Sequence, residues 1–90
     1  MYEVLYSDEV ISEDLSKISA TWKSKIQKAI ESKLMTHPEK YGKPLRRSLK
    51  NYRKLRVGEY RVIFRIEEQE IKVFAIRHRS VVYSISSKRL

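Results

Sequence analysis

Cysteine is absent from the 90-residue sequence, glycine and proline occur twice each, and no run of apolar residues is longer than four. The absence of cysteine excludes disulfide bonds, thiolate chemistry and cysteine-ligated metal sites, so packing must hold the chain together. The short apolar runs argue against a membrane-spanning helix and against the apolar region of a signal peptide. We therefore expect a cytoplasmic protein, and the length predicts one domain over residues 1–90.

Positive charge is abundant but unevenly distributed. The net charge is +9, yet residues 1–36 contain 5 basic and 6 acidic residues, whereas residues 37–90 contain 15 basic and 5 acidic residues. Such an excess is larger than solubility requires. It predicts a polyanionic partner for the second part of the chain, either a nucleic acid or an acidic protein.

The first third of the chain predicts a strand followed by two antiparallel helices. β-forming residues alternate over residues 1–6, and Ser7 is a typical N-cap for a first helix. The expected buried stripe of that helix is Ile11, Leu15 and Ile18. Ser19 or Thr21 can begin the second helix, which ends at His37-Pro38 because a residue before proline disfavours the helical conformation. Its stripe, which we interpret as core packing against a sheet, is Trp22, Ile26, Ala29, Ile30 and Leu34.

Residues 37–50 show no clear periodicity and contain both prolines. Their basic residues are Lys40, Lys43, Arg46, Arg47 and Lys50. A connection of this length often has a function. An equally good interpretation is a solvent-exposed loop that only crosses the edge of the sheet. We include Arg46 and Arg47 among the candidate residues for holding a nucleic acid.

Residues 51–67 predict two strands joined by a tight turn at Gly58-Glu59. Glycine at the first loop position suits a type II′ turn, and a two-residue loop places Arg56 opposite Arg61. One face of this hairpin is then apolar, and the other carries Lys54, Arg56, Arg61 and Arg65. Like charges directly opposite each other destabilise a strand pair, so we expect an anion to be the missing partner.

Residues 70–79 predict a further strand after a turn at Glu68-Gln69. If Glu67 lies opposite Glu70, then Ile76 falls opposite Arg61, His78 joins the basic face and Arg77 points to the other face. A bulge near Arg77 would reverse its direction. The glutamates at this turn have no histidine nearby, so we predict no metal site. Residues 81–90 predict a strand or loop that ends in a short helical turn.

The basic residues suit cleavage of RNA without a metal ion or cofactor. RNA supplies its own nucleophile, the 2′-hydroxyl, and the protein must move protons and place positive charge on the phosphate. Arginine is suited to clamping phosphate, and imidazole changes its protonation state near neutral pH, although a lone histidine is more often structural. The candidates are Lys54, Arg56, Arg61, Arg77, His78, Arg79 and Tyr83.

Three stretches together resemble the RelE/ParE superfamily of toxins from type II toxin–antitoxin systems. They are Gly42 to Arg46, Tyr52 to Arg65, and Ile76 to Tyr83. The resemblance implies an α+β fold of order β-α-α-β-β-β, with an N-terminal strand, two antiparallel helices, a twisted and mainly antiparallel sheet, and a short C-terminal helix. It also implies an acidic, RelB-like antitoxin as partner.

Members of the RelE branch cut messenger RNA in the ribosomal A site and leave a 2′,3′-cyclic phosphate. The resemblance places the functional residues of this branch at Lys54, Arg61, Arg77 and Tyr83. Where that pattern carries a second lysine, this chain has Tyr52, so His78 is an alternative general base. The remaining cations expected to hold RNA are Arg46, Arg47, Arg53, Arg56, Arg65 and Arg79.

Two other functions are compatible with the sequence. The ParE branch shares the fold but is associated with inhibition of DNA gyrase, without nuclease activity. A third hypothesis is a basic binding module whose cations only hold an acidic antitoxin. The joint presence of Lys54, Arg61, Arg77 and Tyr83 favours the nuclease.

Overall fold

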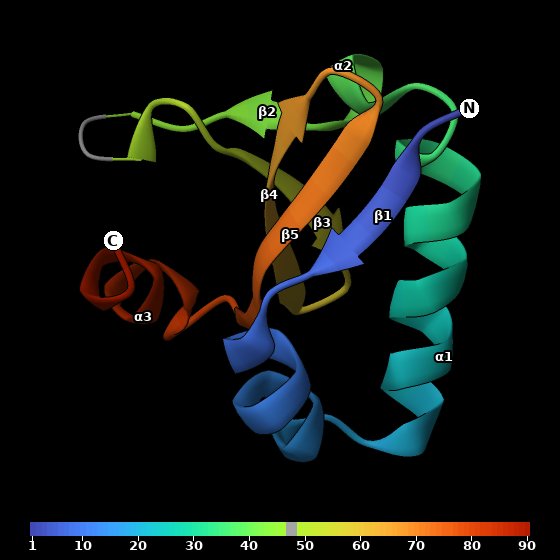
Figure 1. Cartoon of the computed structure of the whole chain (residues 1–90). Helices are drawn as coiled ribbons and strands as arrows, with labels where there is room; N and C mark the ends of the chain where they lie inside the picture. Colours follow the sequence, from blue (N-terminus) through green and yellow to red (C-terminus); the bar gives the residue numbers. More distant parts are fainter. Residues whose placement is uncertain (47–48) are drawn as a thin grey trace.

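The computed structural model describes residues 1–46 and 49–90, which form a five-stranded sheet with helices on both faces (Figure 1). The strands are β1 (Glu3–Tyr6), β2 (Lys43–Pro44), β3 (Arg53–Val57), β4 (Tyr60–Glu67) and β5 (Glu70–His78). Their order is β1-β5-β4-β3-β2. The β1–β5 pair is parallel and the other neighbours are antiparallel, which confirms the predicted mainly antiparallel α+β fold.

The helical segments follow the predicted order along the chain. They are η1 (Val10–Asp14), η2 (Leu15–Lys17), α1 (Ala20–Ala29), η3 (Ile30–Leu34), α2 (Pro38–Tyr41) and α3 (Val82–Lys88). Ser7 Oγ accepts a hydrogen bond from the Val10 N–H, and Ser19 Oγ accepts one from the Trp22 N–H, as expected of N-caps. The first helical segment leads away from β1, and α1 returns alongside the sheet (Figure 1). None of these described helices is long and apolar enough to cross a membrane.

The predicted buried stripe of the first helical segment is confirmed at Ile18, which is buried, and at Leu15, which packs against the core, but it is wrong at Ile11. Ile11 is 59% exposed, while Val10 and Asp14 are fully buried. Val10 and Asp14 are four residues apart, the same spacing as Ile11 and Leu15, so the helical period alone does not decide which of these residues face the core. A carboxylate here occupies a core position.

The main core lies between α1 with its extension η3 and one face of the sheet. Ile26, Ile30 and Leu34 are buried against strand residues, which confirms the predicted stripe. Trp22 packs at the end of this core, with its ring 5.5 Å from that of Tyr60. The sheet residues of this core are Leu55, Val62, Phe64, Ile71, Val73 and Ile76.

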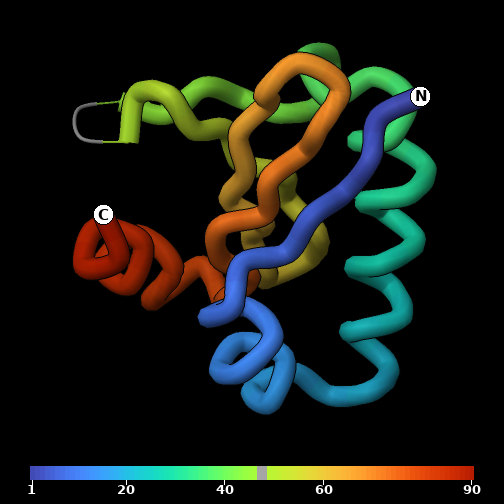
Figure 2. The backbone as a smooth tube through the Cα atoms, in the orientation of Figure 1, coloured from blue at the N-terminus to red at the C-terminus, as the bar shows by residue number. Residues whose placement is uncertain are grey.

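A smaller apolar cluster lies on the other face of the sheet, beneath α3. Val82 of α3 packs there against Ile63 and Ala75. Figure 2 shows α3 and α1 on opposite sides of the sheet. The seven residues of α3 make it longer than the single turn expected from the sequence.

The register of the first hairpin is as predicted, with Val57 opposite Tyr60 and Arg56 opposite Arg61. Gly58 has φ +59°, which suits the first position of a type II′ turn. A Cβ at this position would also lie 2.4 Å from a ring carbon of Trp22. Both the turn and the close approach of the indole therefore require glycine at Gly58.

The register of the second hairpin corrects the prediction. Glu67 does lie opposite Glu70, but an irregularity between Ile63 and Phe64 of β4 leaves Phe74 of β5 without a partner. This β-bulge shifts the remaining pairs by one residue, so that Arg77 rather than Ile76 lies opposite Arg61. His78 accordingly lies opposite Tyr60.

Within residues 37–46, which the structure describes, lie two short elements that periodicity did not indicate. The helix α2 begins at Pro38, and β2 extends the sheet by pairing Lys43 with Lys54. A Cβ at Gly42 would lie 2.3 Å from a ring carbon of Phe64, so glycine lets this segment approach the core. Arg46 is exposed, and Arg47 lies outside the described residues.

Candidate functional site

Three arginines line up across neighbouring strands. Arg56 of β3 lies opposite Arg61 of β4, which in turn lies opposite Arg77 of β5. Like charges in this arrangement repel each other, so each guanidinium must find a partner or face the solvent. The three side chains do so in different ways.

Arg61 lines an open hollow at the Gly58 end of the sheet. We call this hollow the basic groove, and its lining residues are Lys54, Arg61, His78, Arg79, Ser80 and Tyr83. None of these side chains is acidic. The groove therefore brings together four of the five residues predicted to be catalytic and one residue predicted to hold RNA.

Lys54 and Tyr83 approach each other across the groove from β3 and the first turn of α3. The Lys54 Nζ atom is 5.7 Å from the centroid of the Tyr83 ring, within the range of a cation–π contact. Tyr83 is 37% exposed, and it lines the groove together with Lys54. These two side chains can act on the same small group in the groove.

The guanidinium of Arg61 is anchored at one nitrogen. Its Nη1 donates hydrogen bonds to the carbonyl oxygens of Gly58 and Tyr60, both at 2.9 Å. Among the described residues, its Nε and Nη2 atoms make no hydrogen bond, and Arg61 forms no ion pair within 4.0 Å. The anchored group thus retains donors that can hold an anion.

His78 is fixed by a contact with Ser80 that sequence reasoning did not indicate. The Ser80 N–H donates to His78 Nδ1 at 3.1 Å, and the Ser80 Oγ lies 2.8 Å from the same nitrogen. A backbone amide can only donate, so Nδ1 acts as the acceptor and the neutral imidazole carries its proton on Nε2. His78 in this form offers a hydrogen-bond donor rather than a proton acceptor at Nε2.

The other cations predicted to hold RNA are placed in different surroundings. Arg79 pairs with Glu59 at the rim of the groove at 2.6 Å, and Arg56 is exposed beside Arg61. Arg65 is away from the groove lining, where it pairs with Glu67. Arg53 lies opposite Phe64 of the main core and donates to the Gly42 carbonyl oxygen at 2.9 Å, so it is not part of the basic face.

Tyr52, where the resemblance expects a lysine in the nuclease branch, does not line the groove. Its ring packs against Phe74 with centroids 4.8 Å apart, and the Arg65 guanidinium lies 5.7 Å from its centroid. Tyr52 therefore belongs to the small apolar cluster beneath α3 rather than to the cationic site.

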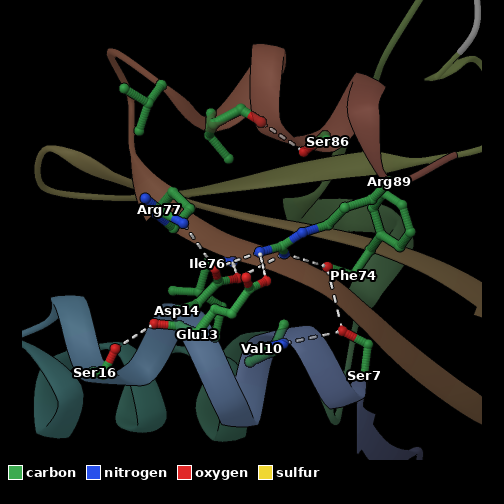
Figure 3. Close-up of polar contacts among 12 residues, drawn as sticks. Ser7, Val10, Glu13, Asp14, Ser16, Phe74, Ile76, Arg77, Ser86 and Arg89 are labelled. Atoms are coloured by element: carbon green, nitrogen blue, oxygen red, sulfur yellow. Dashed lines mark hydrogen bonds and ion pairs between the residues drawn. The ribbon is translucent and has the colours of Figure 1, made fainter.

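Arg77 contacts a buried carboxylate instead of lining the groove, which differs from the role expected for it (Figure 3). Its Nη1 donates to Asp14 Oδ1 at 3.2 Å, and its side chain is only 19% exposed. Asp14 also accepts hydrogen bonds from the Ile76 N–H at 2.9 Å and from both Nη atoms of Arg89, at 2.9 and 2.7 Å. We call Asp14, Arg77 and Arg89 the buried ion cluster.

The electrostatics of this cluster keep Asp14 ionised. Burial alone would raise the pKa of Asp14, but hydrogen bonds from Arg89, the Ile76 amide and Arg77 outweigh burial and hold that pKa below its ordinary value. The hydrogen bond to Asp14 likewise raises the pKa of Arg89. No sequence pattern indicated this cluster, because its partners are more than 60 residues apart.

The chain matches the family model described as the ParE toxin of the type II toxin–antitoxin system, parDE, over residues 4–83. The chain belongs to this family. It is thus a toxin of the RelE/ParE superfamily, as the sequence motifs predicted. A comparison with curated proteins gives no match.

Solved structures agree with this assignment. The toxin–antitoxin complex RelBE2 from Mycobacterium tuberculosis contains a chain that is 26% identical, with a TM-score of 0.75 over 87% of this chain and 98% of that chain. The protein HP0894 from Helicobacter pylori is 10% identical, with a TM-score of 0.64 over 89% and 97% of the two chains. YafQ from E. coli is 14% identical, with a TM-score of 0.58 over 90% and 97%. The last two similarities show the fold alone.

Proposed function

We propose that this toxin is a metal-independent, ribosome-dependent endonuclease that cuts messenger RNA and so inhibits translation. The observation that carries this proposal is the basic groove, in which Lys54, Arg61, His78 and Tyr83 line one hollow without an acidic neighbour among its lining residues. A phosphodiester is the anion that such a set of donors suits.

The proposed reaction uses the 2′-hydroxyl of the RNA as the nucleophile. Its oxygen attacks the adjacent phosphorus, the bond from phosphorus to the 5′ oxygen of the next nucleotide breaks, and a 2′,3′-cyclic phosphate forms. The proton of the 2′-hydroxyl must leave, and the departing 5′ oxygen must gain a proton. We assign the first proton transfer to Lys54 and the second to the Tyr83 hydroxyl, because these two side chains face each other across the groove.

Arg61 and His78 act on the phosphate in this proposal. The free Nε and Nη2 donors of Arg61 stabilise the charge that develops on the phosphoryl oxygens. The Nε2 proton that the Ser80 contact assigns to His78 makes this residue a further donor, so we assign the base to Lys54 rather than His78. Arg77 supports the end of β5 from the buried ion cluster.

Other cations extend the proposed RNA path beyond the groove. Arg79 lies at the rim and Arg56 beside it, and both are exposed. We propose that an acidic antitoxin segment, disordered when free, folds onto the same surface, because a cationic groove with no acidic lining residue suits such a partner. The similar RelBE2 structure is a toxin–antitoxin complex. This function places the toxin in the cytoplasm with the ribosomes.

A cleavage assay on translated message tests the proposal. Purified toxin should cut the message only when ribosomes are present, and Arg61→Ala should abolish the cuts. Lys28→Ala is a matched control, because Lys28 is exposed on α1 on the opposite side of the sheet. Cuts that persist in Arg61→Ala would contradict the role of Arg61, and wild-type toxin that leaves translated message intact would contradict the proposed activity.

A second candidate function is inhibition of DNA gyrase, because the matching family model is that of ParE toxins. A supercoiling assay with purified toxin and gyrase separates the two functions. Inhibition of supercoiling together with intact message would support the gyrase inhibitor. If the toxin affects neither ribosomes nor gyrase but binds an acidic antitoxin through the groove, a binding module is supported instead.

A further inference from the structure

Asp14 joins three segments that are distant in the sequence. It ends η1, it accepts the backbone N–H of Ile76 near the end of β5, and it binds Arg89 immediately after α3 (Figure 3). The end of β5 carries His78 and the first turn of α3 carries Tyr83. One buried carboxylate therefore connects the two elements that hold these groove residues.

Arg89 is firmly held at a position just beyond the end of α3. Its side chain is 8% exposed, and both of its Nη atoms bind Asp14. Nη1 also donates to the carbonyl oxygen of Phe74 at 3.2 Å, at the bulge of β5. The C-terminal end of α3 is thereby attached to the strand that leads to the groove.

The helix α3 depends on such attachments. An isolated helix of seven residues is unstable in water, so contacts with the rest of the protein must hold it in place. Val82 is buried beneath its first turn, and Arg89 is bound just beyond its last turn. Tyr83, which is 37% exposed, lies in the first turn of α3 between these two attachments.

We propose that Asp14 and Arg89 are positioning residues for the basic groove, which hold Tyr83 and His78 in place by fixing α3 to the end of β5. Neither residue touches the groove. The inference rests on the proposed function only for its kinetic consequence. The placement of the two side chains can be measured in the free toxin.

The structural test compares NMR spectra of Arg89→Gln, Arg89→Lys and Glu13→Gln toxins. Glu13→Gln is the matched control, because it removes the charge of an exposed ion-pair partner of the same guanidinium and leaves Asp14 bound. In Arg89→Gln, the ring signals of Tyr83 and His78 should shift and broaden, while the methyl signals of Ile26 and Ile30 in the main core stay in place. Arg89→Lys keeps the charge, so its ring signals should lie between those of wild type and Arg89→Gln. If Arg89→Gln does not fold, Arg89→Lys is compared with wild type in its place.

Ring signals that are unchanged in Arg89→Gln, or that change only together with those of the main core, would overturn the inference.

The kinetic test adds a readout that stability alone would not move. With cleavage at a translated site, kcat of Arg89→Gln should fall about 10- to 100-fold, because small misplacements of reacting groups have effects of this size. KM should change less than about twofold, because the cations that hold RNA are retained. A rise in KM at unchanged kcat would overturn the positioning role, whereas a wild-type toxin that does not cut contradicts the proposed function and leaves the NMR test intact.

Discussion

Arg61 and Arg77 face each other on neighbouring strands, yet they lie in opposite electrostatic surroundings. Arg61 is anchored by two turn carbonyls in the basic groove, where no lining residue is acidic. Arg77 contacts the fully buried Asp14, which also binds Arg89. Two arginines that are equivalent in strand register therefore contribute to different properties of the molecule.

The difference shows what a local carboxylate does to a cationic face. In the buried ion cluster the positive charges are matched by a carboxylate of the protein, so that removing one partner would leave the others uncompensated. In the groove the charges remain available, because hydrogen bonds to carbonyl oxygens orient a guanidinium without neutralising it. The strand register shows where each arginine lies. The group that its guanidinium contacts then decides whether that arginine can bind a ligand.

The largest expected effect comes from removing the carboxylate. Asp14→Ala should lower the free energy of unfolding by about 3–5 kcal/mol, because it removes the buried carboxylate that the Arg77 and Arg89 guanidinium groups share. Arg61→Ala should lower it by only about 1 kcal/mol, since it removes hydrogen bonds to turn carbonyls. Denaturant unfolding of both variants measures the contrast. Equal losses would contradict the division between the two sites.

Acid should weaken the buried ion cluster selectively. The pKa of Asp14 is lower in the folded protein than the value of about 3.9 expected in the unfolded chain. Its contribution to stability is therefore fully present above the unfolded pKa and is lost as the pH falls through the folded pKa. Unfolding of wild type and Asp14→Asn between neutral and acidic pH measures this effect, and their difference in unfolding free energy should shrink as the pH falls. A difference that is constant over this range would show that Asp14 does not bind its partners as an ionised group.

The groove should dominate the interaction with RNA. With a 2′-O-methyl RNA that cannot be cut, Arg61→Ala should reduce the slope of log affinity against log salt concentration by about 0.7, which corresponds to one phosphate contact on a single strand. Arg77→Ala should leave the slope unchanged, because its guanidinium already contacts Asp14. Fluorescence anisotropy over a salt series checks both. If Arg77→Ala reduced the slope as Arg61→Ala is expected to do, Arg77 would lie on the RNA path.

The smallest expected effect concerns the rim of the groove. Arg79 and Glu59 form an ion pair in which both side chains are mostly exposed. Glu59→Gln should change the free energy of unfolding by less than about 1 kcal/mol, as is usual for surface pairs. Thermal unfolding measures this change. A loss as large as that in Asp14→Ala would mean that the rim pair is also structural.

The local parts of the fold could be predicted from the sequence. The Gly58 turn set the register of the first hairpin, because a two-residue loop allows only one pairing of the two strands. The pairing of Arg61 with Arg77 was missed because the bulge at Phe74 depends on how both faces of β5 pack. Lys54, Arg61, His78 and Tyr83 were named from alternation and motif resemblance, and the structure brings them to one hollow.

The buried ion cluster could not be predicted, because it is a tertiary feature. The helical period is as compatible with burial of Val10 and Asp14 as with burial of Ile11 and Leu15, and Asp14 is distinguished only by its tertiary partners, the Ile76 N–H and the Arg77 and Arg89 guanidinium groups. Arg89 lies 75 residues away in the sequence and is adjacent only once α3 folds back onto β5. The pairing of such distant charges leaves no periodic signal in the sequence.

The chemistry of the RNA ends tests the proposed activity most directly. Message translated in the presence of the purified toxin should be cut within codons, and the upstream fragment should end in a 2′,3′-cyclic phosphate. A 2′-O-methyl group at the cut nucleotide should prevent cleavage, because the nucleophile is then blocked. Fragments ending in a 3′-hydroxyl, or cleavage that continues at the methylated site, would contradict a groove that acts through the 2′-hydroxyl of its substrate.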